Sequence, residues 1–526
     1  MSAIIWGEYK SLPRLVKIAI LAEGWIGLRR GLFKVNYETI IGLEVHAQLL
    51  TKSKMFCRCG ADYVNAEPNT RVCPICMGMP GVLPVINQKA IEYVVMTALA
   101  LNCSIPEYAK FDRKNYPYPD LMKGYQISQY DAPLGIYGWM DIEVGEGEDR
   151  GEQKKRRIAI TRVHLEEDAA KLIHRTTAEG ESYSLVDINR AGIPLMEIVS
   201  EPDLRSPEEA RQYLIKLRNI IQFIGVSSGN MEEGSFRCDA NISMRTEGGN
   251  DSVKVEVKNM NSFKSVYRAL KYEEERQRNA IEVGERLTQE TRGWVEDRGV
   301  TVSQRSKEYA HDYRYFHEPD LPPMVSSPKW VAEVGARLPE LPGDRRNRFI
   351  ADYELPYYDA SLLTNSKAMS DYFEACLKLN NKARVKKKAK VVSNWLLGDF
   401  TRLLHATDTE IDNAKITPGL LVEMLELVDN GTLSGAAAKR VFEEMFASGR
   451  RAGDIIAEQG LAQISDVQEI AGVVAQVIIN NTQAVADYKK GKEQALTFMV
   501  GQVIRETRGR ANPAVVNKLL RERLEG

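Results

Sequence analysis

Four short segments of this 526-residue sequence carry acidic, basic and imidazole side chains at alternate positions. If residues 39–49 form a strand, Glu44, His46 and Gln48 share one face, and aliphatic residues occupy the other. Three further segments repeat this pattern. Residues 158–168 group Arg162, His164 and Glu166 on one face, and residues 236–245 group Arg237, Asp239 and Asn241. Residues 253–258 group Lys254, Glu256 and Lys258. Carboxylates, imidazoles, amides and guanidinium groups together suit an anion held with a divalent metal, and Mg²⁺ or Mn²⁺ fits carboxylates with one imidazole.

A set of surface ion pairs is the alternative explanation for each segment taken alone. Four strands that share one pattern favour a site instead, because charges removed from water need partners. The segment that begins at His164 adds Glu166, Glu167 and Asp168 as further possible ligands.

Four of the seven cysteines form a second candidate metal site. Cys57 and Cys59 are followed, after thirteen residues, by Cys73 and Cys76. Paired thiolates at this spacing predict a closed, structural Zn²⁺ site of zinc-knuckle type. The alternative is a group of unligated buried thiols.

The elements that must position these residues are strands mixed with helices over residues 36–328. The clearest helix is predicted at residues 207–224, where Ser206 is the N-cap, Pro207 opens the first turn and Glu209 completes a capping box. After a proline-rich boundary at residues 318–328, strand patterns fade and helices follow to the end. The sequence thus predicts an α+β fold with a helical C-terminal part.

Composition limits the classes of protein that remain. The net charge is −1, so contacts with nucleic acid must come from local basic patches. No apolar run reaches the roughly 20 residues that span a membrane. The clustered cysteines suit a metal site better than a set of disulfides, which indicates a reducing compartment. We therefore expect the protein to be in the cytoplasm.

Residues 1–35 differ from the rest, because they are basic and contain few acids. A start codon assigned too early, with translation beginning at Val35, is the favoured explanation. The alternative is a transit peptide, which would indicate an organelle.

Several longer motifs occur in the order of one known family. Two of them are Ile41-Gly42-Leu43-Glu44-Val45-His46 and Cys73-Pro74-Ile75-Cys76-Met77-Gly78-Met79-Pro80-Gly81; the others are residues 113–116, 118–121, 164–171, 187–192, 197–203 and 234–241. From Tyr37 to the end, the chain strongly resembles the B subunits of aspartyl/glutamyl-tRNA(Asn/Gln) amidotransferase. Departures are His317, where the family often has proline, the extension over residues 1–35, and the cysteine cluster, which only part of the family has.

The resemblance implies a heterotrimer with an amidase A subunit and a small C subunit. The B subunit would bind misacylated tRNA and use ATP and Mg²⁺ to phosphorylate the side chain of Glu-tRNA(Gln) or Asp-tRNA(Asn). Ammonia from the A subunit would then give the amide. The implied domains are a cradle at residues 36–328, a helical domain at 329–412 and a tRNA-binding helical tail at 413–526.

Applied to this chain, the resemblance and the residue chemistry together assign roles as a hypothesis. Glu44, His46 and Glu166 would bind Mg²⁺, with Glu167 and Glu256 as the next candidates. Arg190, Arg237 and Lys258 would face the phosphates of ATP. Lys171, Asp187 and Asp239 would orient reacting groups or line the path of ammonia.

Two alternatives are weighed against this assignment. The related B-type subunit specialised for glutamine carries a large inserted domain, for which this chain has no room. A tRNA-binding scaffold, with the ATP chemistry elsewhere in the complex, is the second.

Overall fold

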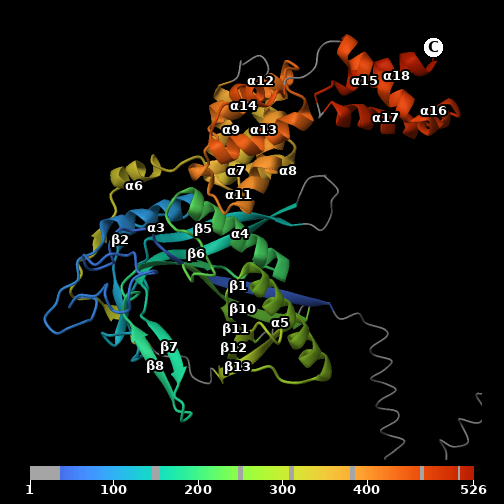
Figure 1. The fold of residues 1–526 in the computed structure, drawn as a ribbon. Helices are drawn as coiled ribbons and strands as arrows, with labels where there is room; N and C mark the ends of the chain where they lie inside the picture. Colours follow the sequence, from blue (N-terminus) through green and yellow to red (C-terminus); the bar gives the residue numbers. More distant parts are fainter. Residues whose placement is uncertain are drawn as a thin grey trace, which may run out of the picture. The chain divides into compact units, whose positions relative to one another are not determined.

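The computed structural model describes residues 36–144, 154–246, 253–306, 313–379, 385–461, 467–507 and 510–525. The chain divides into two compact units, Met1–Pro339 and Glu340–Gly526. A mixed sheet with helices fills the first and helices fill the second, which confirms the predicted α+β class (Figure 1). The extension predicted at residues 1–35 lies outside the described residues. The domain boundaries at residues 328 and 412 stay predictions. Among the described residues, no helix is both long and apolar enough to cross a membrane.

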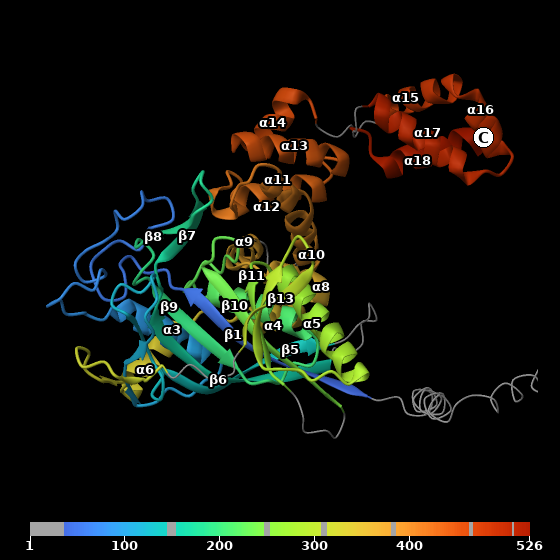
Figure 2. The ribbon, with the colours of Figure 1, turned by 90° about the horizontal axis from the view of Figure 1, so that it is seen from below.

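The first unit is built on one sheet of eight strands, in the order β13-β12-β11-β10-β1-β9-β6-β5. Only β11 and β12 pair in parallel; the other neighbours are antiparallel. Figure 2 shows β9, β1 and β10 side by side. In sheet order the strand bounds are Val300–Ser306, Glu290–Val295, Val255–Met260, Phe236–Thr246, Tyr37–Gln48, Pro194–Ser200, Lys154–Glu167 and Gly135–Val144.

The two faces of this sheet differ, as the alternation predicted. On β1, Ile41, Leu43, Val45 and Ala47 are almost completely buried on one face. Helices α3 (Gln88–Ala100), α4 (Pro207–Phe223) and α5 (Phe263–Val283) pack on the strands from this apolar side. The polar side chains of β1, β6, β9 and β10 share the other face.

Helix α4 begins as predicted. Ser206 is its N-cap and accepts a hydrogen bond from the Glu209 amide at 3.2 Å. The Glu209 carboxylate accepts from the Arg205 amide at 2.8 Å, one residue before the expected partner. The first bond satisfies a backbone donor that the first turn of a helix leaves unpaired, and the second ties the residue before the N-cap to that turn.

Two β-bulges change the alternation in the strands that flank the centre of the sheet. In β6, Ile160 pairs with Ser200 of β9 but Arg162 pairs with Val199, so Thr161 is an extra residue. In β11, Val257 and Met260 both face the apolar side, opposite Ala240 and Cys238. A bulge re-aims the side chains beyond it.

Smaller sheets surround the large one. β2 (Tyr108–Ala109) pairs with β15 (Met324–Val325), and β3 (Asp112–Asn115) lies between β4 (Tyr125–Ser128) and β14 (Phe316–His317). β7 (Lys171–Thr176) and β8 (Ser182–Asp187) form a separate hairpin. Helix α6 spans Pro328–Gly335.

The second unit contains two hydrophobic clusters. Phe349, Phe373, Phe400 and Phe442 belong to the larger one, and Val474, Met499 and Leu520 to the smaller one. The α-helices that supply the larger cluster are α7 (Pro342–Tyr353), α8 (Tyr357–Leu363), α9 (Lys367–Lys378), α10 (Val385–Trp395), α11 (Thr401–Ala406), α12 (Pro418–Asp429), α13 (Gly435–Ser448) and α14 (Ala452–Gln459). Those of the smaller one are α15 (Val467–Asn480), α16 (Thr482–Lys489), α17 (Glu493–Glu506) and α18 (Pro513–Glu525). A π-helix, Leu396–Phe400, joins α10 to α11.

Candidate functional site

Two histidines and two glutamates meet on the polar face, where β6, β9 and β1 lie next to one another. In the strand register, Glu197 of β9 lies between His164 of β6 and His46 of β1. Each histidine Nε2 atom is 3.3 Å from Glu197 Oε2. The Glu166 carboxylate lies 3.7 Å from His46 Nε2 and 3.8 Å from His164 Nε2. These four side chains are called the histidine–glutamate cluster below.

The charges within this cluster compensate one another. Burial lowers the pKa of His46, but the Glu197 and Glu166 carboxylates outweigh burial and raise it to about 9. Burial raises the pKa of Glu197, but the two imidazoles hold it well below its usual range. Ser128 Oγ donates a hydrogen bond to Glu166 Oε2 at 3.1 Å, which orients that carboxylate.

The cluster suits a divalent cation. Ligand atoms of His46, Glu166 and Glu197 all lie within 4.8 Å of one another. Carboxylate oxygens suit Mg²⁺ and Mn²⁺, and one imidazole is compatible with them. Since His46 is the most accessible of the three, with 20% of its side chain exposed, a cation would reach the cluster from its side.

Glu44, from the predicted metal set, lies one step along the same face and has a different partner. It pairs in the register with Asp239 and accepts a hydrogen bond from Asn241 Nδ2 at 2.9 Å. The structure thus brings His46 and Glu166 together, and groups Glu197 with them more closely than Glu44.

Lys258, Asp239 and Glu256 form a neighbouring group on β10 and β11. Lys258 Nζ contacts Asp239 Oδ2 and lies 3.1 Å from Glu256 Oε1. Thr291 of β12 donates a hydrogen bond to Glu256 Oε2 at 2.8 Å. Glu256, predicted as a metal ligand, is therefore engaged in this group and apart from the histidine–glutamate cluster.

Glu167 points elsewhere, because it follows Glu166 directly on β6. Its carboxylate accepts hydrogen bonds from Lys123 Nζ at 2.5 Å and from the Ile127 amide at 2.9 Å. It lines a pocket together with Cys57 and Cys76. The predicted ligand Glu167 thus lies apart from His46 and Glu166.

Arg237 and Arg190 both serve a buried carboxylate, Asp168. Arg237 Nη2 is 3.0 Å from Asp168 Oδ1, and Gln48 Nε2 donates to Oδ2 at 2.7 Å. Arg190 Nε is 3.8 Å from Asp168 and donates to the Ala169 carbonyl at 2.9 Å. Burial raises the Asp168 pKa, but the two guanidinium groups outweigh burial and lower it.

Lys171 and Asp187 lie opposite each other on the β7–β8 hairpin, off the large sheet. Lys171 is exposed. The Asp187 carboxylate accepts hydrogen bonds from the backbone amides of Asn69 and Asn189, at 3.2 and 3.0 Å. The structure does not bring this pair to the histidine–glutamate cluster.

Two members of the cluster were absent from the predicted site set. Glu197 is the single charged residue of β9, Pro-Leu-Met-Glu-Ile-Val-Ser, which otherwise reads as a buried strand. A lone carboxylate in such a run is a signal, because buried charges need partners. His164 shares the predicted alternation with Glu166, which was the available signal for it.

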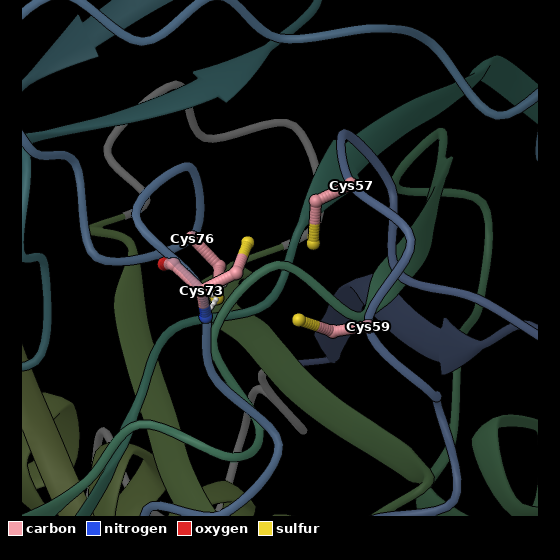
Figure 3. A group of neighbouring side chains, drawn as sticks. All are labelled: Cys57, Cys59, Cys73 and Cys76. Atoms are coloured by element: carbon pink, nitrogen blue, oxygen red, sulfur yellow. Dashed lines mark hydrogen bonds between the residues drawn. The ribbon is translucent and has the colours of Figure 1, made fainter.

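The four cysteines converge as the spacing predicted (Figure 3). One sulfur atom from each of Cys57, Cys59, Cys73 and Cys76 lies within 4.8 Å of the others. Hydrogen bonding by the Cys57 thiol lowers the pKa of Cys76 below its usual range. Closed sulfur ligation of this kind fits a structural Zn²⁺.

Comparison with known families now defines the class of protein. Residues 39–332 match the GatB/GatE catalytic domain, and residues 371–524 match the GatB domain. The histidine–glutamate cluster and all of the sheet except the first two residues of β1 lie within the first match.

Close relatives define the family further. The chain is 55% identical over 495 residues to the B subunit of the aspartyl/glutamyl-tRNA(Asn/Gln) amidotransferase of Dehalococcoides mccartyi, covering 93% of this chain and 99% of that protein. The relatives of the same name from Thermomicrobium roseum and Caldanaerobacter subterraneus are 54% and 53% identical, and the matches cover 93% of this chain and 99% and 100% of theirs. The chain belongs to the family of aspartyl/glutamyl-tRNA(Asn/Gln) amidotransferase B subunits.

Proposed function

We propose that this chain phosphorylates the side-chain carboxylate of Glu-tRNA(Gln), Asp-tRNA(Asn) or both, using ATP, as the B subunit of a tRNA-dependent amidotransferase. The observation that carries the proposal is the histidine–glutamate cluster, which lies on the polar face of the sheet beside two further charged groups, Lys258 with Asp239 and Arg237 with Asp168. The names of the relatives support the substrates.

The reaction brings two anions together. A carboxylate oxygen of the aminoacyl group attacks the γ-phosphorus, the bond to the β-phosphate oxygen breaks, and ADP leaves. Ammonia then attacks the acyl carbon and inorganic phosphate leaves, which gives the amide. Catalysis of such a transfer depends on positioning and on stabilisation of negative charge.

The side chains of this site divide that work. Glu197, Glu166 and His46 would hold a divalent cation, with Glu44 beside them. When bound, Mg²⁺ would supply positive charge to the phosphate oxygens. Lys258 would face the phosphates while Asp239 and Glu256 position its ammonium group. Arg237 and Arg190 would add positive charge at the edge of the site, where both approach Asp168.

The proposed complex contains an amidase A subunit that releases ammonia from glutamine and a small C subunit, and it acts in the cytoplasm. Lys171 and Asp187, on the β7–β8 hairpin, would contribute to the ammonia path or to orientation of the substrate. The four cysteines would bind a structural zinc ion that keeps their loop folded. The helical tail would contact the tRNA.

Reconstitution with the A and C partners and both misacylated tRNAs tests the proposal. ATP-dependent phosphate release and amide formation are followed for wild type, Glu166→Gln and Glu197→Gln. Both cluster variants should lose phosphate release but keep glutaminase activity and tRNA binding. Glu38→Gln is the matched control, because Glu38 lies on β1 and pairs with Arg205 and Arg245, away from the cluster. Wild-type phosphate release by both cluster variants would support a scaffold role instead.

A further inference from the structure

Arg162 occupies an unusual position on the polar face. It lies two residues before His164 on β6, directly after the bulge at Thr161. Without that bulge, Arg162 would share a face with Ile160, which is buried on the apolar side. The extra residue places Arg162, together with His164 and Glu166, on the polar face instead.

The register places Arg162 in one row with Glu44. Arg162 pairs with Val199 of β9, and Val199 pairs with Glu44 of β1. Since neighbouring strands lie about 4.8 Å apart, the backbones of Arg162 and Glu44 are separated by about 10 Å. This row borders the histidine–glutamate cluster on one side.

The guanidinium group of Arg162 differs from the other guanidinium groups of the site in its partners. Its Nε atom is buried and has no hydrogen-bond acceptor in the described part of the chain, and no ion pair of Arg162 is present there either. Arg237 and Arg190, in contrast, already approach Asp168. A buried donor without an acceptor destabilises a fold and needs an explanation, such as a ligand.

We propose that Arg162 binds a phosphate oxygen of the nucleotide. This inference rests on the proposed function and adds a binding residue to it. The planar guanidinium group matches the oxygens of a phosphate with two parallel hydrogen bonds. Arg237 and Arg190 already approach Asp168, whereas no described carboxylate lies within ion-pair distance of the Arg162 guanidinium group.

The test compares Arg162→Gln and Arg162→Lys with wild type in the reconstituted complex. The KM for ATP in tRNA-dependent phosphate release and the affinity for ADP, measured by calorimetry without tRNA, are the readouts. Arg162→Gln should weaken both about 10- to 100-fold, because a hydrogen-bonded charge pair is lost. For Arg162→Lys, the KM for ATP and the ADP affinity should lie between those of wild type and Arg162→Gln. Lysine keeps the positive charge but lacks the two parallel donors of the guanidinium group. The KM for Glu-tRNA(Gln) should not change.

Arg156→Gln is the matched control. Arg156 lies on the same strand and forms an ion pair with Glu209 at 3.0 Å, so its loss should leave the KM for ATP unchanged. The melting temperature of Arg162→Gln should not fall below that of wild type, because Arg162 forms no ion pair with a described residue that the variant would break.

Three results would overturn the inference: unchanged ADP affinity and KM for ATP, a rise in the KM for Glu-tRNA(Gln) alone, or a lower melting temperature with normal nucleotide binding. If the wild-type complex released no phosphate, the proposed function would fail. The ADP measurement would still decide the role of Arg162.

Discussion

His46 and Glu197 lie directly opposite each other on adjacent antiparallel strands, and His46 Nε2 is 3.3 Å from Glu197 Oε2. His164 approaches the same carboxylate oxygen at the same distance from the other neighbouring strand. One carboxylate thus joins β6, β9 and β1 at the centre of the polar face. Binding of a cation at the histidine–glutamate cluster would therefore depend on the negative charge of Glu197.

Loss of that charge should weaken divalent metal binding. In Glu197→Gln, we expect the affinity for Mn²⁺ to fall at least about 10-fold, because changes even to residues that only support metal ligands reach this size. Electron paramagnetic resonance of free Mn²⁺ measures it. Glu38→Gln on β1 should bind Mn²⁺ like wild type. Equal affinities for wild type and Glu197→Gln would exclude the cluster as the metal site.

The cysteine cluster predicts bound zinc. We expect about one zinc ion per chain by mass spectrometry of the metal content, and its loss in Cys73→Ser, because closed four-sulfur sites need every ligand. Cys103→Ser is the matched control, since Cys103 is buried and lies outside the cluster. Equal zinc content in wild type and Cys73→Ser would contradict the assignment.

Backbone strain next to Lys258 gives a third prediction. Asn259 lies in the bulge of β11 with φ of 65°, a conformation that β-branched residues rarely adopt. Asn259→Val should destabilise the first unit by about 1–2 kcal/mol and reduce phosphate release, because a strained residue directly follows Lys258 in the chain. Asn259→Gly, which adopts this φ freely, should keep wild-type stability and activity. Urea unfolding and phosphate release measure both; an unaffected Asn259→Val would show that the bulge tolerates a β-branched residue.

Acid should destabilise the contact between α7 and α9. Arg345 and Arg348 of α7 both donate hydrogen bonds to Glu374 of α9, the latter at 2.7 Å. Burial raises the Glu374 pKa, but the two guanidinium groups outweigh burial and lower it below its ordinary value of 4.5. The stabilisation is therefore fully present above that ordinary pKa of 4.5 and is lost as the pH falls through the lowered pKa.

Hydrogen exchange of α7 and α9, corrected for the intrinsic rate at each pH, measures this dependence. At pH 6, Glu374→Gln should reduce protection by about 1.5–3 kcal/mol, the value of a hydrogen bond to a charged group. The difference between the variant and wild type should shrink as the pH falls through the lowered Glu374 pKa. Glu354→Gln is the control, because Glu354 is exposed at the end of α7. A difference that stays constant throughout the acid titration would show that Glu374 acts by shape rather than by charge.

Much of the site follows from local pattern. The alternation in β1 and β10 placed Glu44, His46, Arg237 and Asp239 on one face, because successive side chains of a strand point to opposite sides. The cysteine spacing predicted the convergence of four thiols. The start of α4 at Ser206 was also legible, since a cap depends only on neighbouring residues.

Other features depend on residues distant in the sequence. Glu197 joined the cluster because β9 pairs with both β1 and β6, and the partners of the Glu167 carboxylate, Lys123 and the Ile127 amide, come from a segment about 40 residues earlier. The bulge at Thr161 placed Arg162 on the polar face. The sequence by itself determined which side chains share a strand face and which four cysteines converge. Only the tertiary structure decided which faces meet, because strand order, register and bulges are set by pairing between segments far apart in the chain.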